Sequence, residues 1–215
     1  MTARPAETRL IEVAIEQFGQ NGMTAVGTRA IAEAAGLQMS AITYHFGGKD
    51  GLYRACAEHI AAQMSERLAP VLSLAGAEDG ASGDPAGARA AILAILGGLV
   101  TVMMHDDVAP IARFVVREQM NPTAAFDIIY DRAIRRVIDR IVILVQRVAG
   151  GRLPGEELRV RSLALLGQVF AFRFARAAVM RATGWESVGL SETEAVRAAV
   201  LAHSDAILRA LEAAP

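Results

Sequence analysis

The sequence predicts an all-α fold of about nine helices. Hydrophobic residues make up 53% of the chain and aromatic residues only 5%, and the helix-favouring residues alanine, leucine, arginine and glutamate are abundant. Apolar residues recur at helical spacing, as in Leu52, Cys56, Ile60 and Met64. No segment has a convincing strand pattern. The 215 residues suffice for one large domain, or for a small domain joined to a larger one.

Four helices are predicted in the N-terminal third. The first spans about residues 4 to 21 and ends at Asn21-Gly22, a common helix stop. Two short helices, at about 28 to 35 and 39 to 46, are separated by Gly36. The fourth is long, from near Lys49 to about Leu74, and a glycine-rich connector at 75 to 84 follows it.

Capping signals mark the remaining helices, which are expected to start near residues 85, 107, 122, 156 and 191. Asp84 and Asn121 each precede a proline and predict a capping side chain with proline at the first helical position. Gly184 is expected to end a single helix from about residue 156. Ser191 to Glu194 has the spacing of a capping box for the last helix, which reaches about Ala213.

Residues 90 to 104 contain no charge, but the stretch includes Gly97, Gly98 and Thr101 and is shorter than the roughly 20 residues of a membrane span. A buried core helix is therefore expected, with no membrane partner. The single cysteine, Cys56, excludes an internal disulfide and fits a reducing compartment. The first ten residues, "MTARPAETRL", lack the apolar core of a secretory signal, so a cytoplasmic location is expected.

The stretch from Thr28 to His45 has the spacing of a helix-turn-helix motif. Ile31 and Ala35 fall on one face of a short helix, Gly36 permits a tight turn, and Ile42 faces back from the next helix. The exposed face of the second helix of such a motif can enter the major groove of DNA. A hairpin of alanine-rich helices with no role in DNA binding would show the same spacing.

Residues 8 to 60 resemble the TetR family of bacterial transcriptional regulators. The run "TRAIAEAAGLQMSAITYHFGGKDGLYRA" is similar to the family signature, and "REQMNPTAAFDIIY" (117 to 130) and "GQVFAFRFARAAVMRATGW" (167 to 185) resemble its CecR-like branch. The resemblance implies a DNA-binding domain at residues 1 to 62, with the motif at about 28 to 46. It also implies a domain at 63 to 215 that binds an effector and dimerises.

By this resemblance, the DNA-binding positions are Thr28, Arg29, Met39, Ser40, Ala41, Thr43, Tyr44, His45 and Lys49. Two positions depart from the family pattern. The family commonly has tyrosine where this chain has Thr43, with the aromatic residue here following at Tyr44, and serine as the helix cap where this chain has Gln38. Which of Thr43 and Tyr44 reaches the DNA backbone stays open.

The Gly47-Gly48-Lys49 stretch raises the question of a phosphate site. A nucleotide-binding Walker A loop is excluded, because Thr43 and Asp50 stand where it needs glycine and a hydroxyl residue. A contact to a DNA phosphate is expected instead, from unobstructed glycine amides, the Lys49 charge and the positive end of the following helix. Residues 1 to 60 carry five basic and six acidic groups, so binding should depend on a few placed contacts doubled in a dimer.

The C-terminal part suggests two further surfaces. Phenylalanines at 170, 172 and 174 make one helix apolar on two faces, which suggests contact with a partner or a ligand in addition to the core. The resemblance implies a two-fold dimer, with candidate contacts Phe172, Arg176, Ala195, Ala199 and Ala202. The helix with these phenylalanines and the last helix, with these alanines, could instead be ordinary core helices.

A small, largely apolar ligand is expected to bind among deformable, aromatic and charged side chains, namely Met103, Met104, His105, Arg113, Phe114, Arg117, Phe126, Tyr130 and Phe170. Ordinary core packing and surface ion pairs would explain these residues equally well. A ligand that favours a dimer geometry unsuited to DNA would lower DNA affinity.

Enzyme chemistry is not expected. Cys56 and His59 lie one helical turn apart, but no third group orients them, and the adjacent residues His105, Asp106 and Asp107 do not converge on one metal ion. The sequence therefore predicts a homodimeric transcriptional regulator without cofactor or metal. It is expected to be a repressor that a ligand releases from a palindromic operator in double-stranded DNA. The alternative is a helical small-molecule-binding or adaptor module that does not bind DNA.

Overall fold

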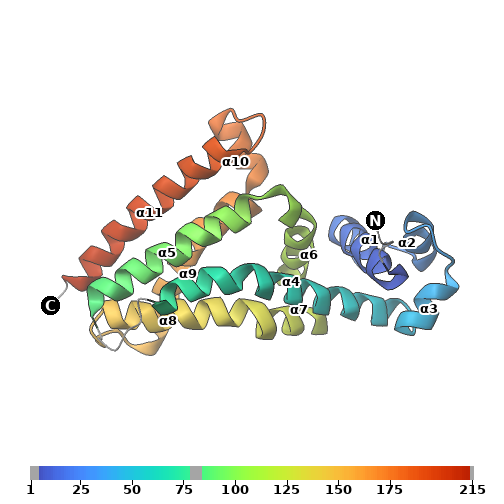
Figure 1. Ribbon diagram of the computed structural model, residues 1–215, viewed down its shortest axis with the longest axis horizontal. Helices are drawn as coiled ribbons and strands as arrows, with labels where there is room; N and C mark the ends of the chain where they lie inside the picture. The colour runs from blue at the N-terminus through green and yellow to red at the C-terminus, as the bar shows by residue number, and fades with distance from the viewer. Residues whose placement is uncertain (1–4, 78–83, 214–215) are drawn as a thin grey trace. The chain divides into compact units, whose positions relative to one another are not determined.

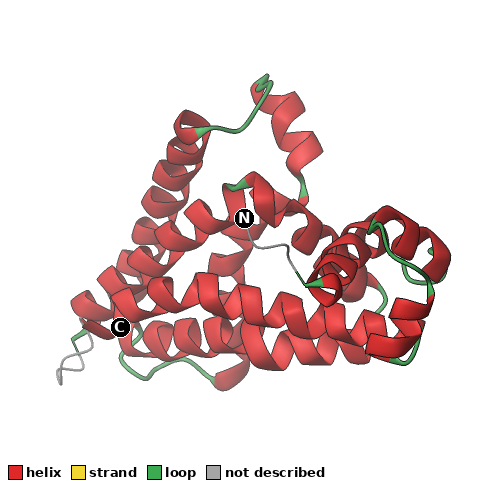
Figure 2. Cartoon of the chain, turned by 45° about the vertical axis from the view of Figure 1, so that its right-hand side comes forward, coloured by secondary structure: helices red, strands yellow, loops and turns green. Residues whose placement is uncertain are grey.

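A computed structural model describes residues 5–77 and 84–213, and all its regular elements in these ranges are helical (Figures 1 and 2). This confirms the all-α prediction. The helices are α1 (Ala6–Asn21), α2 (Thr28–Ala34), α3 (Ser40–Phe46), α4 (Lys49–Ala77), α5 (Pro85–Met104), α6 (Ala109–Met120), α7 (Ala124–Ile129), α8 (Arg135–Val148), α9 (Gly155–Phe174), α10 (Arg176–Thr183) and α11 (Leu190–Glu212). A 3-10 turn (Asp106–Val108) precedes α6, and a π turn (Tyr130–Ile134) joins α7 to α8.

The chain divides into two compact units. Unit 1 comprises the residues up to Ser65 together with Asp107–Ile134, and unit 2 comprises Glu66–Asp106 and the residues from Arg135 onward. The chain first passes from unit 1 to unit 2 after Ser65, whereas the domain boundary was expected at residue 62. The sequence-based division, however, assigned residues 107 to 134 to the C-terminal domain, whereas here α6 and α7 pack with the N-terminal helices.

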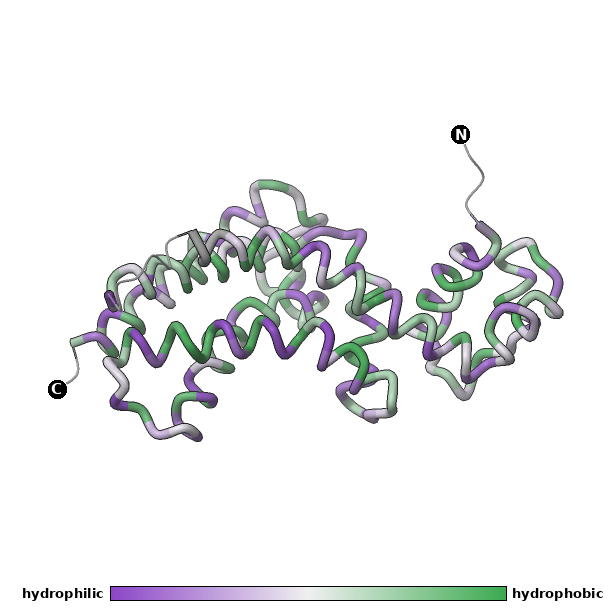
Figure 3. The backbone as a smooth tube through the Cα atoms, turned by 60° about the horizontal axis from the view of Figure 1, so that its bottom comes forward, coloured by the Kyte–Doolittle hydropathy of each residue, from purple (hydrophilic) through white to green (hydrophobic). Residues whose placement is uncertain are grey.

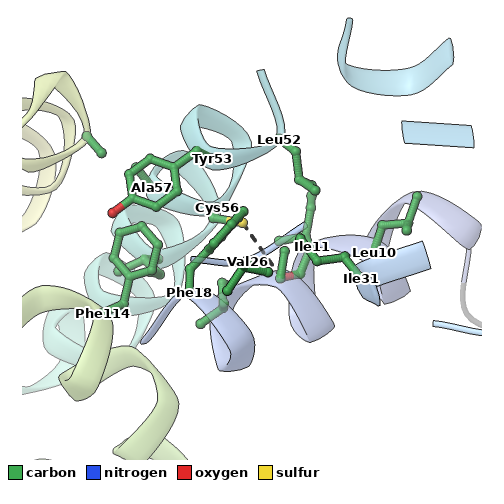
Figure 4. Close-up of a cluster of buried hydrophobic side chains, with 14 of the residues drawn as sticks. Leu10, Ile11, Phe18, Val26, Ile31, Leu52, Tyr53, Cys56, Ala57 and Phe114 are labelled. Carbon is green, nitrogen blue, oxygen red and sulfur yellow. Dashed lines mark hydrogen bonds between the residues drawn. The ribbon is translucent and has the colours of Figure 1, made fainter. Parts of the chain in front are cut away.

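The core of unit 1 is formed mainly by α1, α2, α3 and α4, and α6 closes it (Figure 4). The ring of Phe18 meets Tyr53 edge-on at 5.0 Å between centroids, and Tyr53 lies 4.8 Å from Phe114 of α6. Ile31 and Ile42, from the two helices of the predicted motif, are both almost fully buried in this core. The motif is thus anchored by side chains on its inner faces.

α1 and α6 approach each other closely at Gly19. A Cβ atom at this position would lie 3.2 Å from the backbone nitrogen of Phe114 and from the carbonyl oxygen of Pro110. Two arginines of α6 hold the end of α1: Arg117 donates to the carbonyl oxygens of Gly19, at 2.8 Å, and Gln20, and Arg113 pairs with Glu16 at 2.6 Å. These contacts explain why residues after 106 belong to the N-terminal unit.

α5 is the central helix of unit 2 and packs against α8, α9 and α11. Figure 1 shows α11 alongside α5. α5 is long and apolar enough for a membrane span, but half of its most apolar window is buried inside the protein. Along the helices, hydrophilic and hydrophobic residues follow each other at short intervals (Figure 3), as expected of helices that bury one face.

Several helix boundaries differ from those expected. Asp84 caps α5 as predicted, accepting a hydrogen bond from the Ala86 amide at 3.0 Å. Thr123, not Asn121, caps α7, through a hydrogen bond from the Ala125 amide to its hydroxyl oxygen at 3.1 Å. Both the asparagine and the threonine are capping residue types, so local pattern alone does not choose between them.

The last two helices expected from the sequence also differ from those in the structure. The expected single helix from 156 to 184 is broken at Ala175, where φ is −97° and ψ is 27°. The final helix starts at Leu190 with Gly189 as its N-cap, so Ser191 lies inside the helix. The Glu192 carboxylate, rather than that of Glu194, accepts a hydrogen bond from the Gly189 amide at 2.8 Å. This bond and the Glu192 amide lower the pKa of the Glu192 carboxyl group.

Candidate nucleic-acid interface

The turn between α2 and α3 is fixed by its backbone. Gly36 adopts a left-handed conformation with φ of 65°. The Leu37 amide donates to the Ala32 carbonyl at 2.9 Å and the Gly36 amide to the Glu33 carbonyl at 3.0 Å, the two bonds of a Schellman motif. The following helix, α3, starts without a side-chain cap, in keeping with Gln38 in place of serine. The relative orientation of α2 and α3 is therefore set by the glycine turn and by the core.

α3 has one buried and one exposed face. Ile42 is buried, Phe46 is half-buried against the core, and Ser40, Thr43 and Tyr44 are exposed. Because positions i, i+3 and i+4 of a helix lie on one side, these three exposed side chains share a face. Met39, immediately before the helix, is 54% exposed, whereas Ala41 is half-buried and packs against the core.

Thr43 and Tyr44 are both available on this surface. The Tyr44 side chain is 85% exposed, and its ring meets His45 edge-on at 5.0 Å between centroids. Thr43 is also exposed, so its hydroxyl is accessible. Its carbonyl oxygen accepts a hydrogen bond from the Gly47 amide at the end of α3. The exposed face of α3 thus carries both Thr43 and Tyr44, whereas the family commonly has a single tyrosine at the position of Thr43.

The junction of α3 and α4 differs from the phosphate loop expected there. The Gly47 amide is not free for an anion, because it donates to the Thr43 carbonyl at 2.9 Å and caps α3. Gly47 and Gly48 have φ of 73° and 129°, so both positions favour glycine. Lys49 is the first residue of α4 and is half-buried. Its ammonium group, rather than a ring of amides, is the feature suited to a phosphate.

Gly51, in the first turn of α4, was not singled out from the sequence. A Cβ atom there would lie 1.8 Å from the carbonyl oxygen of Phe46, the last residue of α3. Any side chain would therefore force α3 and α4 apart. A glycine in the first turn of a long helix is the signal that could have revealed this contact, because glycine is unfavourable inside helices.

The remaining predicted DNA contacts lie at the start of α2. Thr28 and Arg29 are its first two residues, and Gly27 precedes them in an extended conformation. Arg29 is exposed and Thr28 half-exposed, so the Arg29 guanidinium group is accessible from solvent. α2 and α3 thus each present polar side chains away from the shared core.

A buried polar contact links α4 to α6 within unit 1. The Tyr53 hydroxyl donates to the Glu118 carboxylate at 2.6 Å, and Glu118 is only 2% exposed. The same carboxylate accepts hydrogen bonds from the Thr123 amide at 3.1 Å and hydroxyl at 2.8 Å. Burial and the bond to Glu118 raise the pKa of Tyr53. A second bond ties α4 to the π turn, from the Ser65 hydroxyl to the Arg132 carbonyl at 3.1 Å.

Cys56 is part of this core and has no features of a nucleophile. Its side chain is fully buried, its thiol lies 3.8 Å from the Ile11 carbonyl oxygen (dashed in Figure 4), and burial raises its pKa. His59 instead pairs with Gln63, at 2.6 Å between their nitrogens. Within residues 5–77 and 84–213, no group of three histidine, cysteine, aspartate or glutamate side chains could hold a metal ion.

The residues expected to line a ligand pocket fall into both units. In unit 1, Phe114 is buried in the core, and Arg113 and Arg117 hold α1 as described above. Phe126 and Tyr130 form a ring pair with centroids 5.9 Å apart. In unit 2, the others lie at the end of α5, just after it and in the last turns of α9. They are Met103 (half-buried), Met104 (buried), His105 (exposed) and Phe170 (half-buried). Each α6 residue of the set thus has a structural role inside unit 1.

Unit 2 presents an exposed stripe of apolar and small residues along α9 and α11. On α9 the stripe contains Val160, Leu163, Ala164, Gly167, Ala171 and Phe174, and on α11 it contains Ala195, Ala198, Ala199, Ala202, Ala206 and Ile207. The predicted contacts Ala195, Ala199 and Ala202 lie on it. Phe172 does not, because it is half-buried, and the Arg176 guanidinium pairs with Asp106 at 3.0 Å. Phe174, which stacks on Phe170 at 5.7 Å between centroids, is the exposed phenylalanine of this helix.

The two parts of the chain match two family models. The model for bacterial regulatory proteins of the tetR family matches residues 10–56, which span the helix-turn-helix. The chain belongs to the TetR family, and it is a DNA-binding transcriptional regulator. Residues 88–211 match the C-terminal domain of the HTH-type transcriptional dual regulator CecR, so the resemblance seen in the sequence is confirmed for both parts.

Individual relatives agree with the family models. The chain is 33% identical over 212 residues to the dual regulator CecR of Shigella flexneri, covering 96% of this chain and 92% of that protein. It is 46% identical over 67 residues to the regulatory protein RaaS of Mycobacterium tuberculosis, 31% of each chain.

Solved structures share the fold. AibR, in complex with isovaleryl coenzyme A and operator DNA, has a TM-score of 0.67 at 13% identity and covers 93% of this chain and 97% of its own. A transcriptional regulator from Rhodococcus sp. Rha1 has a TM-score of 0.64 at 16% identity, over 98% and 100% of the two chains.

Proposed function

We propose that this regulator reads a palindromic operator through the exposed face of α3. The observation that carries the proposal is that Ser40, Thr43 and Tyr44 share one exposed face, while Ile42, on the opposite side, is locked into the core. A rigid helix whose polar side chains all point outward is suited to the major groove. DNA recognition thus belongs to unit 1.

Each side chain on this surface has a role that fits its chemistry. The hydroxyl groups of Ser40 and Thr43 are short and suit base edges, whereas the long, 85% exposed Tyr44 reaches a backbone phosphate. His45, next to Tyr44 on α3, and Lys49, at the start of α4, hold further phosphates. Arg29, at the start of α2, contacts either guanine or phosphate. This division assigns base readout to Thr43 and backbone contact to Tyr44.

The stripe on α9 and α11 is the proposed dimer surface. Exposed alanines and a glycine allow close approach of two helices, and Val160, Leu163 and Phe174 add apolar area that would otherwise face water. A two-fold dimer built on this face presents two copies of α3 to the two half-sites of a palindrome. Dimerisation thus belongs to unit 2.

A small, largely apolar effector is proposed to control DNA binding. AibR was crystallised with both isovaleryl coenzyme A and operator DNA, so one relative in fold binds an acyl thioester as well as DNA. In this chain α6 is suited to coupling, because its Arg117, Phe114 and Glu118 contact α1 and α4 of the DNA-binding part. A coupling of about 1 to 3 kcal/mol suffices for release. Without the effector, the protein acts as a repressor in the cytoplasm, and it carries out no catalysis.

Selection of bound DNA from a random pool, followed by affinity measurements on the selected operator, tests the proposal. Arg29→Ala and Lys49→Ala should each weaken operator binding by about ten-fold or more, because each removes a contact twice per dimer. Arg136→Ala, a matched change of an exposed arginine on α8, should leave the affinity unchanged. Light scattering should show the same mass for all variants.

The alternative is a helical ligand-binding or adaptor module that does not bind DNA. Enrichment of no common sequence, together with unchanged DNA affinity in Arg29→Ala and Lys49→Ala, would favour it. A palindrome among the selected sequences would support both DNA recognition and two-fold symmetry. Titration of acyl thioesters and other apolar compounds against the operator complex then tests the effector, and loss of the complex is the expected result.

A further inference from the structure

The segment between α9 and α11 projects from unit 2. We call residues 176–190 the α10 arm. α9 ends at Phe174, and the axis of α10 departs from that of α9 by 76°. In Figure 1, α10 and the following loop lie at the top, next to the upper ends of α5 and α11. The chain could have continued as one straight helix, since no glycine or proline lies between 168 and 183.

The chain itself gives the arm little support. α10 has eight residues, none of them buried, and among the described residues α9 is the one helix with which it makes more than marginal contact. Its ion pair, Arg176 with Asp106, has side chains that are 34% and 71% exposed, so the pair contributes little stability. A helix this short is not stable in water without packing.

The arm carries apolar side chains that face water. Leu190 is 91% exposed, and Val179, Met180 and Trp185 are only half-buried. Its charged residues, Arg176, Arg181 and Glu186, are of both signs and do not form the basic face typical of a helix that lies on a membrane. The arm therefore has the composition of a protein contact.

The position of the arm identifies its partner. It begins two residues after Phe174, at one end of the stripe on α9, and it finishes at Leu190, where α11 begins and continues the stripe toward Ala195. We propose that in the homodimer the α10 arm packs against the partner protomer and buries Leu190 and Trp185 there. This inference rests on the proposed dimer and adds a second contact beyond its helical face.

Trp185 makes the inference directly measurable, because it is the only tryptophan in the chain and its emission reports on the arm. Quenching by iodide is compared between the native protein and Ala202→Glu, which places a charge on the α11 stripe and should separate the protomers. Trp185 should be protected in the dimer and more strongly quenched, with red-shifted emission, in the monomeric variant. Ala199→Glu serves as a second variant if the first does not keep its helical circular dichroism.

A second experiment tests the arm without disrupting the stripe. Leu190→Ser should raise the dimer dissociation constant by about ten-fold, measured by analytical ultracentrifugation over a dilution series. Met120→Ser is the matched control, because Met120 is 74% exposed but lies in unit 1, and it should leave the constant unchanged.

The outcomes distinguish a failure of the arm contact from a failure of the proposed homodimer. If the native protein is a dimer but Trp185 is quenched equally in dimer and monomer, and Leu190→Ser dimerises normally, the arm proposal is overturned and the dimer stands. If the native protein is a monomer at all concentrations, the proposed homodimer fails, and the arm contact fails with it.

Discussion

The hydrogen bond between Tyr53 and Glu118 allows a sharp test of how α6 is held to the DNA-binding helices. Tyr53→Phe keeps the ring that packs on Phe18 and Phe114 but removes the hydroxyl 2.6 Å from the Glu118 carboxylate. Glu118 is 2% exposed, so water cannot readily replace the lost donor, and its two bonds from Thr123 remain. A buried hydrogen bond to a charged group contributes about 1.5 to 3 kcal/mol, so the free energy of unfolding should fall by about 2 kcal/mol.

The assay is urea unfolding followed by circular dichroism at one fixed protein concentration, since the stability of a dimer depends on concentration. Tyr44→Phe is the matched control: it removes a hydroxyl from a side chain that is 85% exposed, and its effect should stay within about 0.5 kcal/mol. Glu118→Met completes a double-mutant cycle with Tyr53→Phe. The pair should show a coupling energy of about 1 to 2 kcal/mol.

Two results would refute the reasoning. A loss in Tyr53→Phe no larger than that in Tyr44→Phe would mean that the hydroxyl contributes nothing to stability. Strict additivity of Tyr53→Phe and Glu118→Met would mean that the two groups do not interact in solution, whatever their separate effects.

Two further predictions concern the junction of α3 with α4 and the response to alkali. Gly51→Ala should lower the free energy of unfolding by about 1 to 3 kcal/mol and weaken operator binding, because its Cβ would meet the Phe46 carbonyl oxygen. Gly155→Ala, in open space at the start of α9, is the control and should do neither. Normal operator affinity in Gly51→Ala would contradict the close contact. The raised pKa values of Cys56 and Tyr53 mean that both groups ionise more readily in the unfolded chain, so stability should fall as pH rises above about 8.5 and again above about 10. In urea unfolding between pH 9 and 11, the free energy of unfolding of Tyr53→Phe should fall less steeply with pH than that of the native protein. An equally steep fall would count against a buried neutral tyrosine.

Local sequence features predicted much of the fold. The glycine turn at Gly36, the buried Ile42 and the cap at Asp84 follow from patterns within a few residues, and the structure has all three. The choice of Thr123 over Asn121 did not follow, because both residue types cap helices and Thr123 is selected by its additional bonds to Glu118.

Features that depend on distant residues could not be predicted. The break at Ala175 has no glycine or proline to signal it, and it lies next to Arg176, whose partner Asp106 is far away in the sequence. The exposed face of α3 was predicted by family resemblance. That Thr43 and Tyr44 are both accessible became clear only from the structure, because burial of a side chain depends on the whole core.

The discontinuous composition of unit 1 has a consequence for protein synthesis. The helix-turn-helix emerges from the ribosome early, but Phe114, Arg117 and Glu118, which close its core and hold α1 and α4, come from Asp107–Ile134. At roughly 5 to 20 residues per second, the ribosome needs several seconds to progress from Ser65 to Ile134. During this interval the nascent DNA-reading part lacks its last helices, so it should remain a substrate for chaperones until α7 has left the exit tunnel.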